Sequence, residues 1–183
     1  MEIIDTKIRE VKILKPQVFG DSRGYFMETW REEFFRSNIF DKPLVQDNQS
    51  SSTLGVLRGL HYQTSQTQGK LVRVLSGRVY DVAVDIRKSS PTFGQYVGVE
   101  LSGENKLQFW VPEGFAHGFY VMSDEAVFAY KCTDYYDPSS EHSIIWNDPD
   151  LNIAWPIADG VKVNLSEKDL KRATSFRDAV YFD

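Results

Sequence analysis

Two of the three histidines are the residues best suited to chemistry in this sequence. His61 lies in the strand-like stretch GLHYQ, and His117 lies among aromatic residues in PEGFAHGF. A neutral imidazole exchanges protons readily near pH 7. A histidine among apolar residues is more often hydrogen-bonded and structural than catalytic. Because an isolated lysine and aspartate lie nearby in a β-rich chain, both interpretations stay open.

The residues around these histidines do not favour a metal site. Double-stranded β-helix proteins that bind iron or another metal often use two closely spaced histidines, a carboxylate and a later histidine. Here Gln63 stands two positions after His61, and no glutamate follows at short range. We therefore expect no bound metal.

Nucleophilic and cofactor chemistry also lack a motif. Cys132 has no sign of an activating base nearby, no serine lies in a nucleophile elbow, and no glycine-rich phosphate loop is present. Acid–base chemistry without a cofactor remains, carried by histidine, tyrosine, lysine and aspartate. Such groups suit proton transfer beside a carbonyl, where a base, an acid and a cation near the oxygen suffice.

The stretch from Gln46 to Gln63, QDNQSSSTLGVLRGLHYQ, places His61 in context. Its serine-rich half predicts a loop, and its glycine-punctuated half predicts a strand that enters a core. Arg58 and His61 are costly to bury in such a strand unless they are paired or used. The segment is therefore a candidate part of a site.

The strongest strand signal runs from Gly69 to Arg87, with Ser76-Gly77 as a two-residue hairpin turn. This turn predicts a register that pairs Lys70 with Ala83 and Val72 with Asp81. Lys70 and Asp81 then share one face, either as a pocket lining or as a solvated ion pair. A pairing of Asp81 with His117 is a further hypothesis.

The rest of the chain predicts a mainly β domain over residues 1–183. Residues 1–19 predict two short strands with a break at Pro16, and a glycine-rich turn follows. Further strands are expected at 96–101, 107–111, 118–121 and 126–130. This spacing is typical of a β-sandwich or closed barrel. Short helices are expected at 30–38 and after Ser166, which is a suitable N-cap.

The composition limits which classes of binding partner and which cellular compartment are expected for this protein. The chain has 183 residues, a 42% apolar fraction and a net charge of −5, which argues against a nucleic acid or an anionic membrane as the partner. No apolar run predicts a membrane span or a secretory signal. A single cysteine indicates a reducing compartment, so a cytoplasmic protein is expected.

Seven motifs together resemble the dTDP-4-dehydrorhamnose 3,5-epimerase family, in the family's order. They are FGDSRGYFMETW, QDNQSSSTLGVLRGLHYQ, KLVRVLSGRVYDVAVDIR, SPTFG, WVPEGFAHGFYV, YKCTDYY and LSEKD. The resemblance implies a metal-free cupin jelly roll with a few short helices that forms a homodimer. It also implies epimerisation of dTDP-4-dehydro-6-deoxy-D-glucose at C3 and C5, without a cofactor, in dTDP-L-rhamnose biosynthesis.

The resemblance further implies a role for each matching residue. His61 matches the general base, Asp169 the carboxylate that orients it, Tyr130 the acid on the opposite face and Lys70 the cation at the enolate oxygen. The positions that match substrate-binding residues are Arg23, Glu28, Gln46, Asp47, Asn48, Arg58, Lys70, His117, Glu141 and Lys168.

The residues alone leave alternatives at several of these positions. Asp169 stands three residues after Ser166, where a capping role is the better interpretation without the resemblance. Tyr135 and Tyr136 compete with Tyr130 for the role of the acid. Three other functions also remain: a relative that epimerises one carbon or isomerises the sugar, a non-catalytic sugar-binding jelly roll, and a metal-dependent cupin oxygenase.

Overall fold

The strands predicted from the sequence form two facing antiparallel sheets of a cupin-like jelly roll. A computed structural model describes residues Met1–Asp183. The elements in chain order are β1 (Glu2–Asp5), β2 (Lys12–Lys15), β3 (Val18–Asp21), β4 (Gly24–Met27), α1 (Glu32–Asn38), β5 (Gln46–Thr53), β6 (Leu57–Gln63), β7 (Lys70–Ser76), β8 (Arg78–Asp85), β9 (Tyr96–Ser102), β10 (Gln108–Val111), β11 (Phe115–Val121), β12 (Glu125–Cys132), β13 (Glu141–Ser143), α2 (Glu167–Arg172) and a 3-10 turn at Phe176–Asp178.

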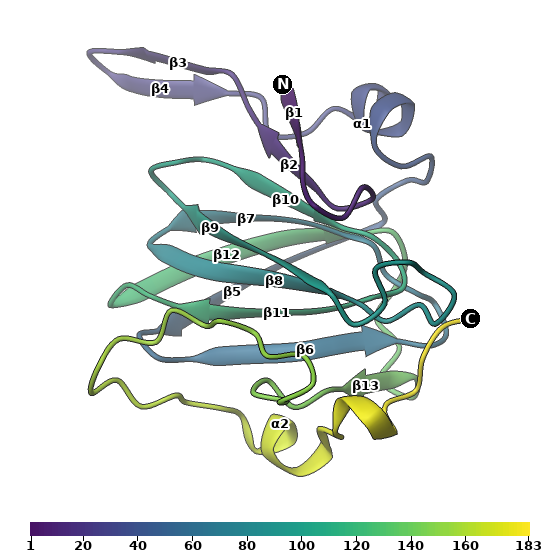
Figure 1. The fold of residues 1–183 in the computed structure, drawn as a ribbon. Coiled ribbons are helices and arrows are strands. Elements are labelled where there is room, and N and C mark those ends of the chain that lie inside the picture. The colour runs from purple at the N-terminus through teal and green to yellow at the C-terminus, as the bar shows by residue number, and fades with distance from the viewer.

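The two sheets enclose the core of the molecule (Figure 1). One sheet has the order β1-β2-β10-β7-β12-β5, and the other has the order β13-β6-β11-β8-β9. Alternate residues of each strand point inward, as the twofold period of a strand requires. Val72, Phe128, Val79 and Phe119 pack together between the sheets. The fold class predicted from the strand spacing is confirmed.

The strands on either side of Ser76-Gly77 do not pair, which shows that the predicted register was wrong. β7 lies between β10 and β12, whereas β8 lies between β11 and β9. Gly77 has a φ of +77°, and a Cβ there would lie 2.0 Å from the Glu125 carbonyl oxygen. This tight turn carries the chain from one sheet to the other, so two strands adjacent in sequence lie on opposite walls.

The serine-rich segment is strand β5 and not the predicted loop. It pairs with β12 over its whole length, from Gln46 opposite Cys132 to Thr53 opposite Glu125. Its residues alternate between partly buried and exposed along most of the strand. Short polar side chains have little β propensity, and an edge strand with one polar face does not need apolar neighbours. The following half is a strand, β6, as predicted.

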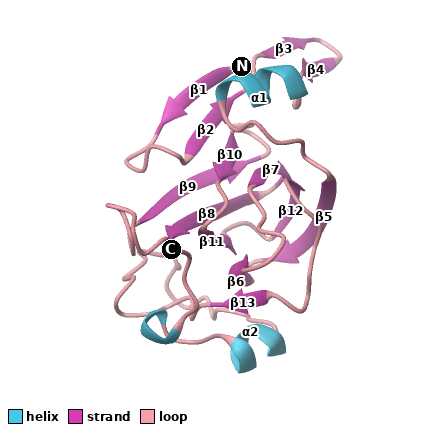
Figure 2. Cartoon of the chain, turned by 90° about the vertical axis from the view of Figure 1, so that its right-hand side faces the viewer, coloured by secondary structure: helices cyan, strands magenta, loops and turns pink.

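Two segments lie at opposite ends of the molecule. The β3–β4 hairpin forms a sheet of its own that extends from one end, and α2 lies at the other (Figures 1 and 2). The predicted first helix is present but begins at Glu32. The second begins after Ser166, whose side chain accepts a hydrogen bond from the Asp169 backbone N–H, so the predicted N-cap is confirmed. Neither helix is long and apolar enough to cross a bilayer.

Candidate active site

A cavity of about 460 Å³ opens between the two sheets and is partly lined by the C-terminal segment, residues 164–169. Its size lies within the range of small-molecule sites, about 300–1,000 Å³. Seven of the residues predicted for the site line it: Arg58, His61, Lys70, His117, Tyr130, Lys168 and Asp169. They come from β6, β7, β11, β12 and the C-terminal segment, so the fold brings together residues more than 100 positions apart in sequence.

A β-bulge lets Arg58 and His61 line the same cavity. Residues three apart in a regular strand point to opposite faces. Here β6 carries one extra residue: His61 is opposite His117 and Arg58 is opposite Phe119, so the register shifts between the two pairs. Gly59 takes up the shift at a φ of +123°, and a Cβ there would lie 2.5 Å from the Gly118 Cα. Only glycine fits this close approach of β6 to β11.

Asp169 holds the His61 imidazole and also contacts Ser166, the N-cap of α2. Its Oδ1 lies 2.5 Å from His61 Nε2, and its Oδ2 accepts from the Ser166 hydroxyl at 2.8 Å. Its backbone N–H donates to Ser166 Oγ at 3.1 Å. Burial works to raise the pKa of Asp169, but the bonds from His61 and Ser166 outweigh it and hold that pKa below its usual value. The expected capping box is incomplete, because the carboxylate contacts the Ser166 hydroxyl and not its backbone N–H. Asp169 nevertheless contacts both His61 and the N-cap residue of α2.

Lys70 lies on the opposite wall, at the start of β7. Its Cα partners are Cys132 on β12 and Val111 on β10. Burial lowers the pKa of the Lys70 ammonium, while Cys132, Glu141 and Asp81 act in the opposite direction. Lys70 and Asp81 therefore influence each other across the interior, and not as neighbours on one sheet. Of the two sequence interpretations, the structure supports the pocket lining.

Tyr130 is the tyrosine that lines the cavity. It lies on β12 beside Phe128, and burial raises the pKa of its hydroxyl. Tyr135 and Tyr136 follow the strand and are 60% and 49% exposed. Neither of them lines the cavity. A phenol with a raised pKa stays protonated at neutral pH and is available as a proton donor.

The C-terminal segment is tied to β13 at the mouth of the cavity. Lys168 forms an ion pair with Glu141, whose Oε2 also accepts from the Tyr136 hydroxyl at 2.9 Å. Burial would raise the pKa of Glu141, but the bonds from Lys168 and Tyr136 outweigh it and lower that pKa. Glu141 thus contacts a cavity residue without lining the cavity itself.

Comparison with known proteins assigns this arrangement to a family. The model of the dTDP-4-dehydrorhamnose 3,5-epimerase family matches residues 5–178. The chain belongs to that family. The epimerase of Shigella flexneri is 54% identical over all of this chain and 99% of its own length. The epimerase of Neisseria gonorrhoeae is 58% identical over 95% of this chain, which spans about half (52%) of that longer relative.

A solved epimerase structure shares the fold. The dTDP-6-deoxy-D-glucose-3,5-epimerase of Legionella pneumophila, in complex with dTDP-4-keto-L-rhamnose, is 56% identical and superposes with a TM-score of 0.93. The match covers 98% of this chain and 94% of the other. The family named from the motifs is therefore confirmed, and it is a family of isomerases.

Three further positions that match substrate-binding residues of the family lie on β5, next to the cavity but not in its lining. Gln46 and Asn48 are on the inner face, where Asn48 Nδ2 lies 3.7 Å from Cys132 Sγ and Gln46 Nε2 donates to Asn48 Oδ1. Asp47 points to the other face and pairs with Lys131 at 2.6 Å. Their role in binding stays a prediction.

The last two predicted positions, Arg23 and Glu28, lie far from this cavity. Arg23 is at the tip of the β3–β4 hairpin, pairs with Asp21 and has a side chain that is 88% exposed. Glu28 follows β4 and pairs with Arg31. The hairpin and the C-terminal segment that lines part of the cavity occupy opposite ends of the molecule (Figure 2). Within one chain, these two residues cannot reach the site.

Several lining residues were missed in the sequence. Gln49 and Ser50 come from the strand that was taken for a loop, and Asn164 comes from the segment before α2. Gln49 and Ser50 would have been identified if the serine-rich segment had been recognised as a strand that pairs with β12. No group of three or more histidine, cysteine, aspartate or glutamate side chains in the chain is arranged to hold a metal ion.

Proposed function

We propose that this chain inverts C3 and C5 of dTDP-4-dehydro-6-deoxy-D-glucose by proton transfer beside the C4 ketone. The observation that carries the proposal is a cavity in which a carboxylate-held imidazole faces a lysine and a tyrosine on the opposite sheet. The family membership and the related structure that holds dTDP-4-keto-L-rhamnose support the choice of substrate.

His61 is the proposed base. Asp169 accepts from Nε2–H and leaves the Nδ1 lone pair free to take a proton from the sugar carbon. The carboxylate also stabilises the imidazolium that forms, as in other carboxylate–imidazole pairs. The electron pair of the broken C–H bond moves to O4 as an enolate, and the Lys70 ammonium stabilises this charge more in the transition state than in the ground state.

Inversion requires that the new proton arrive from the face opposite the base. His61 lies on β6 in the five-stranded sheet, and Tyr130 lies on β12 in the six-stranded sheet. A sugar ring held between the sheets therefore has the imidazole on one face and the phenol on the other. Tyr130 gives its proton to the carbon, and the same pair acts at C3 and again at C5.

The charge of the lining suits an anionic substrate. Three cationic side chains, Arg58, Lys70 and Lys168, line the cavity with a single carboxylate, Asp169, although the whole chain carries a net charge of −5. Arg58 is held at the edge between the sheets by Ser52 Oγ, at 3.1 Å from Nε and 3.0 Å from Nη2. Its planar guanidinium is suited to grip a diphosphate.

Solvent exchange tests this function. In deuterium oxide, without added metal or cofactor, wild-type protein should incorporate deuterium at both C3 and C5 of the dTDP keto sugar, followed by NMR. His61→Asn should abolish the exchange. Incorporation at one carbon only would instead establish a single-site epimerase, and no incorporation by the wild type would refute the proposal.

We also propose that the active form is a homodimer. The β3–β4 hairpin exposes Phe19 and Phe26, at 56% and 70%, and an isolated two-stranded hairpin is only marginally stable in water. Arg23 lies in this hairpin and Glu28 directly after it, and neither residue lines the cavity of its own subunit. A second copy that covers the hairpin can bring both residues to a cavity in the other subunit.

Mixing two inactive variants tests the dimer. His61→Asn keeps the hairpin intact, and Arg23→Ala keeps the base intact. If the hairpin completes the partner's cavity, each mixed dimer has one intact site, and an equal mixture should recover about a quarter of the wild-type activity. A monomeric mass in sedimentation, or no recovery after exchange of subunits, would refute the proposal.

We further propose a cytoplasmic location. Cys132 is buried and unpaired, and it has no second cysteine with which to form a disulfide. Such a thiol is typical of proteins in a reducing compartment. Recovery of the protein with the cytoplasmic fraction of the source cells would support this location, and recovery elsewhere would contradict it.

A further inference from the structure

A second carboxylate–imidazole pair lies beside the first on the same wall of the cavity. His117 on β11 is the cross-strand partner of His61 on β6. Its Nε2 lies 2.9 Å from Oδ1 of Asp81 on β8, the next strand of the sheet. His117 lines the cavity, and its other ring nitrogen, Nδ1, has no partner in the protein. Each histidine therefore has a carboxylate at Nε2 and a free Nδ1.

Asp81 differs from an ordinary buried aspartate because it is poorly satisfied. It has no exposed surface, and its second carboxylate oxygen, Oδ2, has no hydrogen-bond partner. A buried polar atom without a partner is destabilising. Val79 and Ala83, its neighbours on the same face of β8, belong to the apolar core. An apolar side chain would suit the stability of this position better than a carboxylate.

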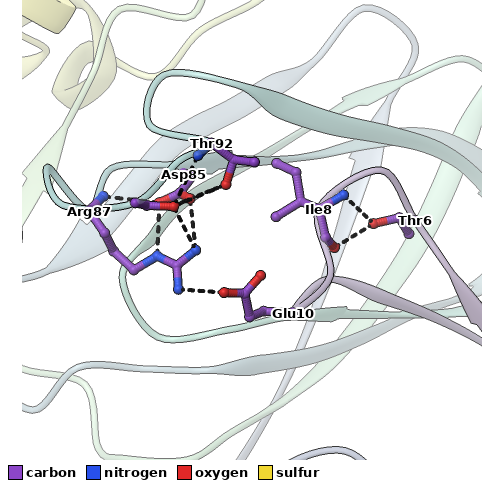
Figure 3. Close-up of polar contacts among 7 residues, drawn as sticks. Thr6, Ile8, Glu10, Asp85, Arg87 and Thr92 are labelled. Carbon is purple, nitrogen blue, oxygen red and sulfur yellow. Dashed lines mark hydrogen bonds and ion pairs between the residues drawn. The ribbon is translucent and has the colours of Figure 1, made fainter.

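Asp85, four residues further along β8, shows what a structural aspartate looks like in this chain. It is also fully buried, but Arg87 binds it with two nitrogens, at 2.9 and 2.7 Å, and Ser90 and Thr92 each donate to it at 2.6 Å (Figure 3). Glu10 binds the same arginine at 3.1 Å. Asp85 closes a loop away from the cavity and leaves neither oxygen unpaired.

We propose that Asp81 is a positioning residue: it holds His117 as the Nε2–H tautomer, so that Nδ1 faces the substrate as a hydrogen-bond acceptor. This role rests on the proposed epimerase function. A neutral imidazole can carry its proton on either nitrogen, and a carboxylate at one of them selects the tautomer. An acceptor fixed at the cavity wall is complementary to a hydroxyl group of a sugar.

Two cavity residues counteract the effect of burial on Asp81. Burial raises the pKa of the Asp81 carboxyl above its ordinary value, and His117 and Lys70 offset part of this rise. The carboxylate in turn opposes the effect of burial on the Lys70 ammonium. Asp81 thus interacts with two cavity residues, His117 and Lys70, without lining the cavity itself.

A double-mutant cycle tests whether Asp81 acts through His117. In Asp81→Asn the amide can donate to Nε2, which moves the imidazole proton to Nδ1. Loss of such a supporting partner lowers activity by about 10–100-fold at metal-bound histidines, and we expect a loss of that size in kcat/KM. His117→Gln should show a similar loss, and the double variant should lose no more than His117→Gln alone. Additive losses, or an Asp81→Asn variant with wild-type kcat/KM, would overturn the proposal.

Asp85→Asn is the matched control, because it removes the charge of a second buried aspartate on the same face of β8. It breaks a satisfied ion pair, so Tm should fall by about 6–12 °C while kcat/KM stays near the wild-type value. Asp81→Asn should show the reverse, with nearly unchanged Tm and lower activity. A large loss of Tm in Asp81→Asn would indicate a structural role and overturn the proposal.

The tautomer itself is measurable without turnover. Only three histidines contribute to the ¹⁵N NMR spectrum of selectively labelled protein. His117 should appear as the Nε2–H form in the wild type and as the Nδ1–H form in Asp81→Asn. If the wild type fails to epimerise the keto sugar, the proposed function is wrong and this spectrum alone decides the role of Asp81. An unchanged tautomer in Asp81→Asn would refute that role.

Discussion

Replacement of Asp169 by asparagine tests the contact on which the proposed base depends. Asp169 Oδ1 lies 2.5 Å from His61 Nε2. In the proposed mechanism the carboxylate accepts from Nε2–H, and Nδ1 is left to take the proton from the sugar carbon. An asparagine can instead donate its amide hydrogen to Nε2. The imidazole proton then lies on Nδ1, where it blocks the lone pair that must take the proton from the sugar carbon.

The expected loss follows from the tautomer. In serine proteases the same change at the aspartate of the triad lowers kcat by about 10⁴-fold while the geometry stays intact. We expect a fall in kcat of about 10³–10⁴-fold for Asp169→Asn, equivalent to about 4–5 kcal/mol of transition-state stabilisation. The cap should persist, because the backbone N–H of residue 169 still donates to Ser166 Oγ and an amide oxygen can accept from its hydroxyl.

Ser166→Ala is the control for this prediction. It removes the N-cap of α2 and one contact to Asp169 but keeps the carboxylate at His61. The cap is worth about 1 kcal/mol, so Tm should fall by about 2–4 °C. Steady-state kinetics and thermal unfolding of both variants provide the comparison. If Ser166→Ala lowers kcat as far as Asp169→Asn, Asp169 acts by holding the segment in place and the tautomer argument is refuted.

Three further outcomes follow from the same geometry. Lys70→Gln should lower kcat by about 10²–10³-fold with little change in KM, because its charge acts mainly on the enolate; a matching rise in KM would contradict this. Tyr130→Phe should keep deuterium exchange at the carbon that His61 deprotonates while net inversion falls by about 10²-fold, and equal losses in both assays would argue against its role. The pKa of Glu141 lies below its ordinary value of 4.5. The ionised carboxylate therefore stabilises the folded protein above pH 4.5, and this stabilisation is lost as the pH falls through the lowered pKa. The Tm of the wild type should therefore decline more steeply in acid than that of Glu141→Gln, and parallel declines would refute the linkage.

Strand positions were predictable because they depend on local pattern. Alternation and turn residues located β6, β9, β10, β11 and β12 to within a few residues. Sheet membership was not predictable in the same way, and Ser76-Gly77 shows why. A two-residue glycine turn usually joins strands that pair, but here the turn packs against β12 and passes between sheets. That choice depends on contacts some 50 residues away.

The candidate site was predictable only in part, for a related reason. The cost of burying Arg58 and His61 identified β6 as part of a candidate site from its residue types alone. The hypothesis that Asp81 pairs with His117 is confirmed, with 2.9 Å between Oδ1 and Nε2. The carboxylate at His61 was named only through the family resemblance. Asp169 lies 108 residues from His61, in a position where local sequence indicates a helix cap. No periodicity links two such distant positions.

The double use of Asp169 explains why local and global signals do not conflict there. Asp169 is held rigidly, because its backbone N–H and its carboxylate both bind Ser166, the N-cap of α2. The same restraint aims the free oxygen, Oδ1, at His61 without a further supporting side chain. Asp81 has no comparable local partner and remains unsatisfied at Oδ2. The Asp169 carboxylate is thus compatible with stability, whereas the Asp81 carboxylate is unfavourable for stability and is explained by its proposed function.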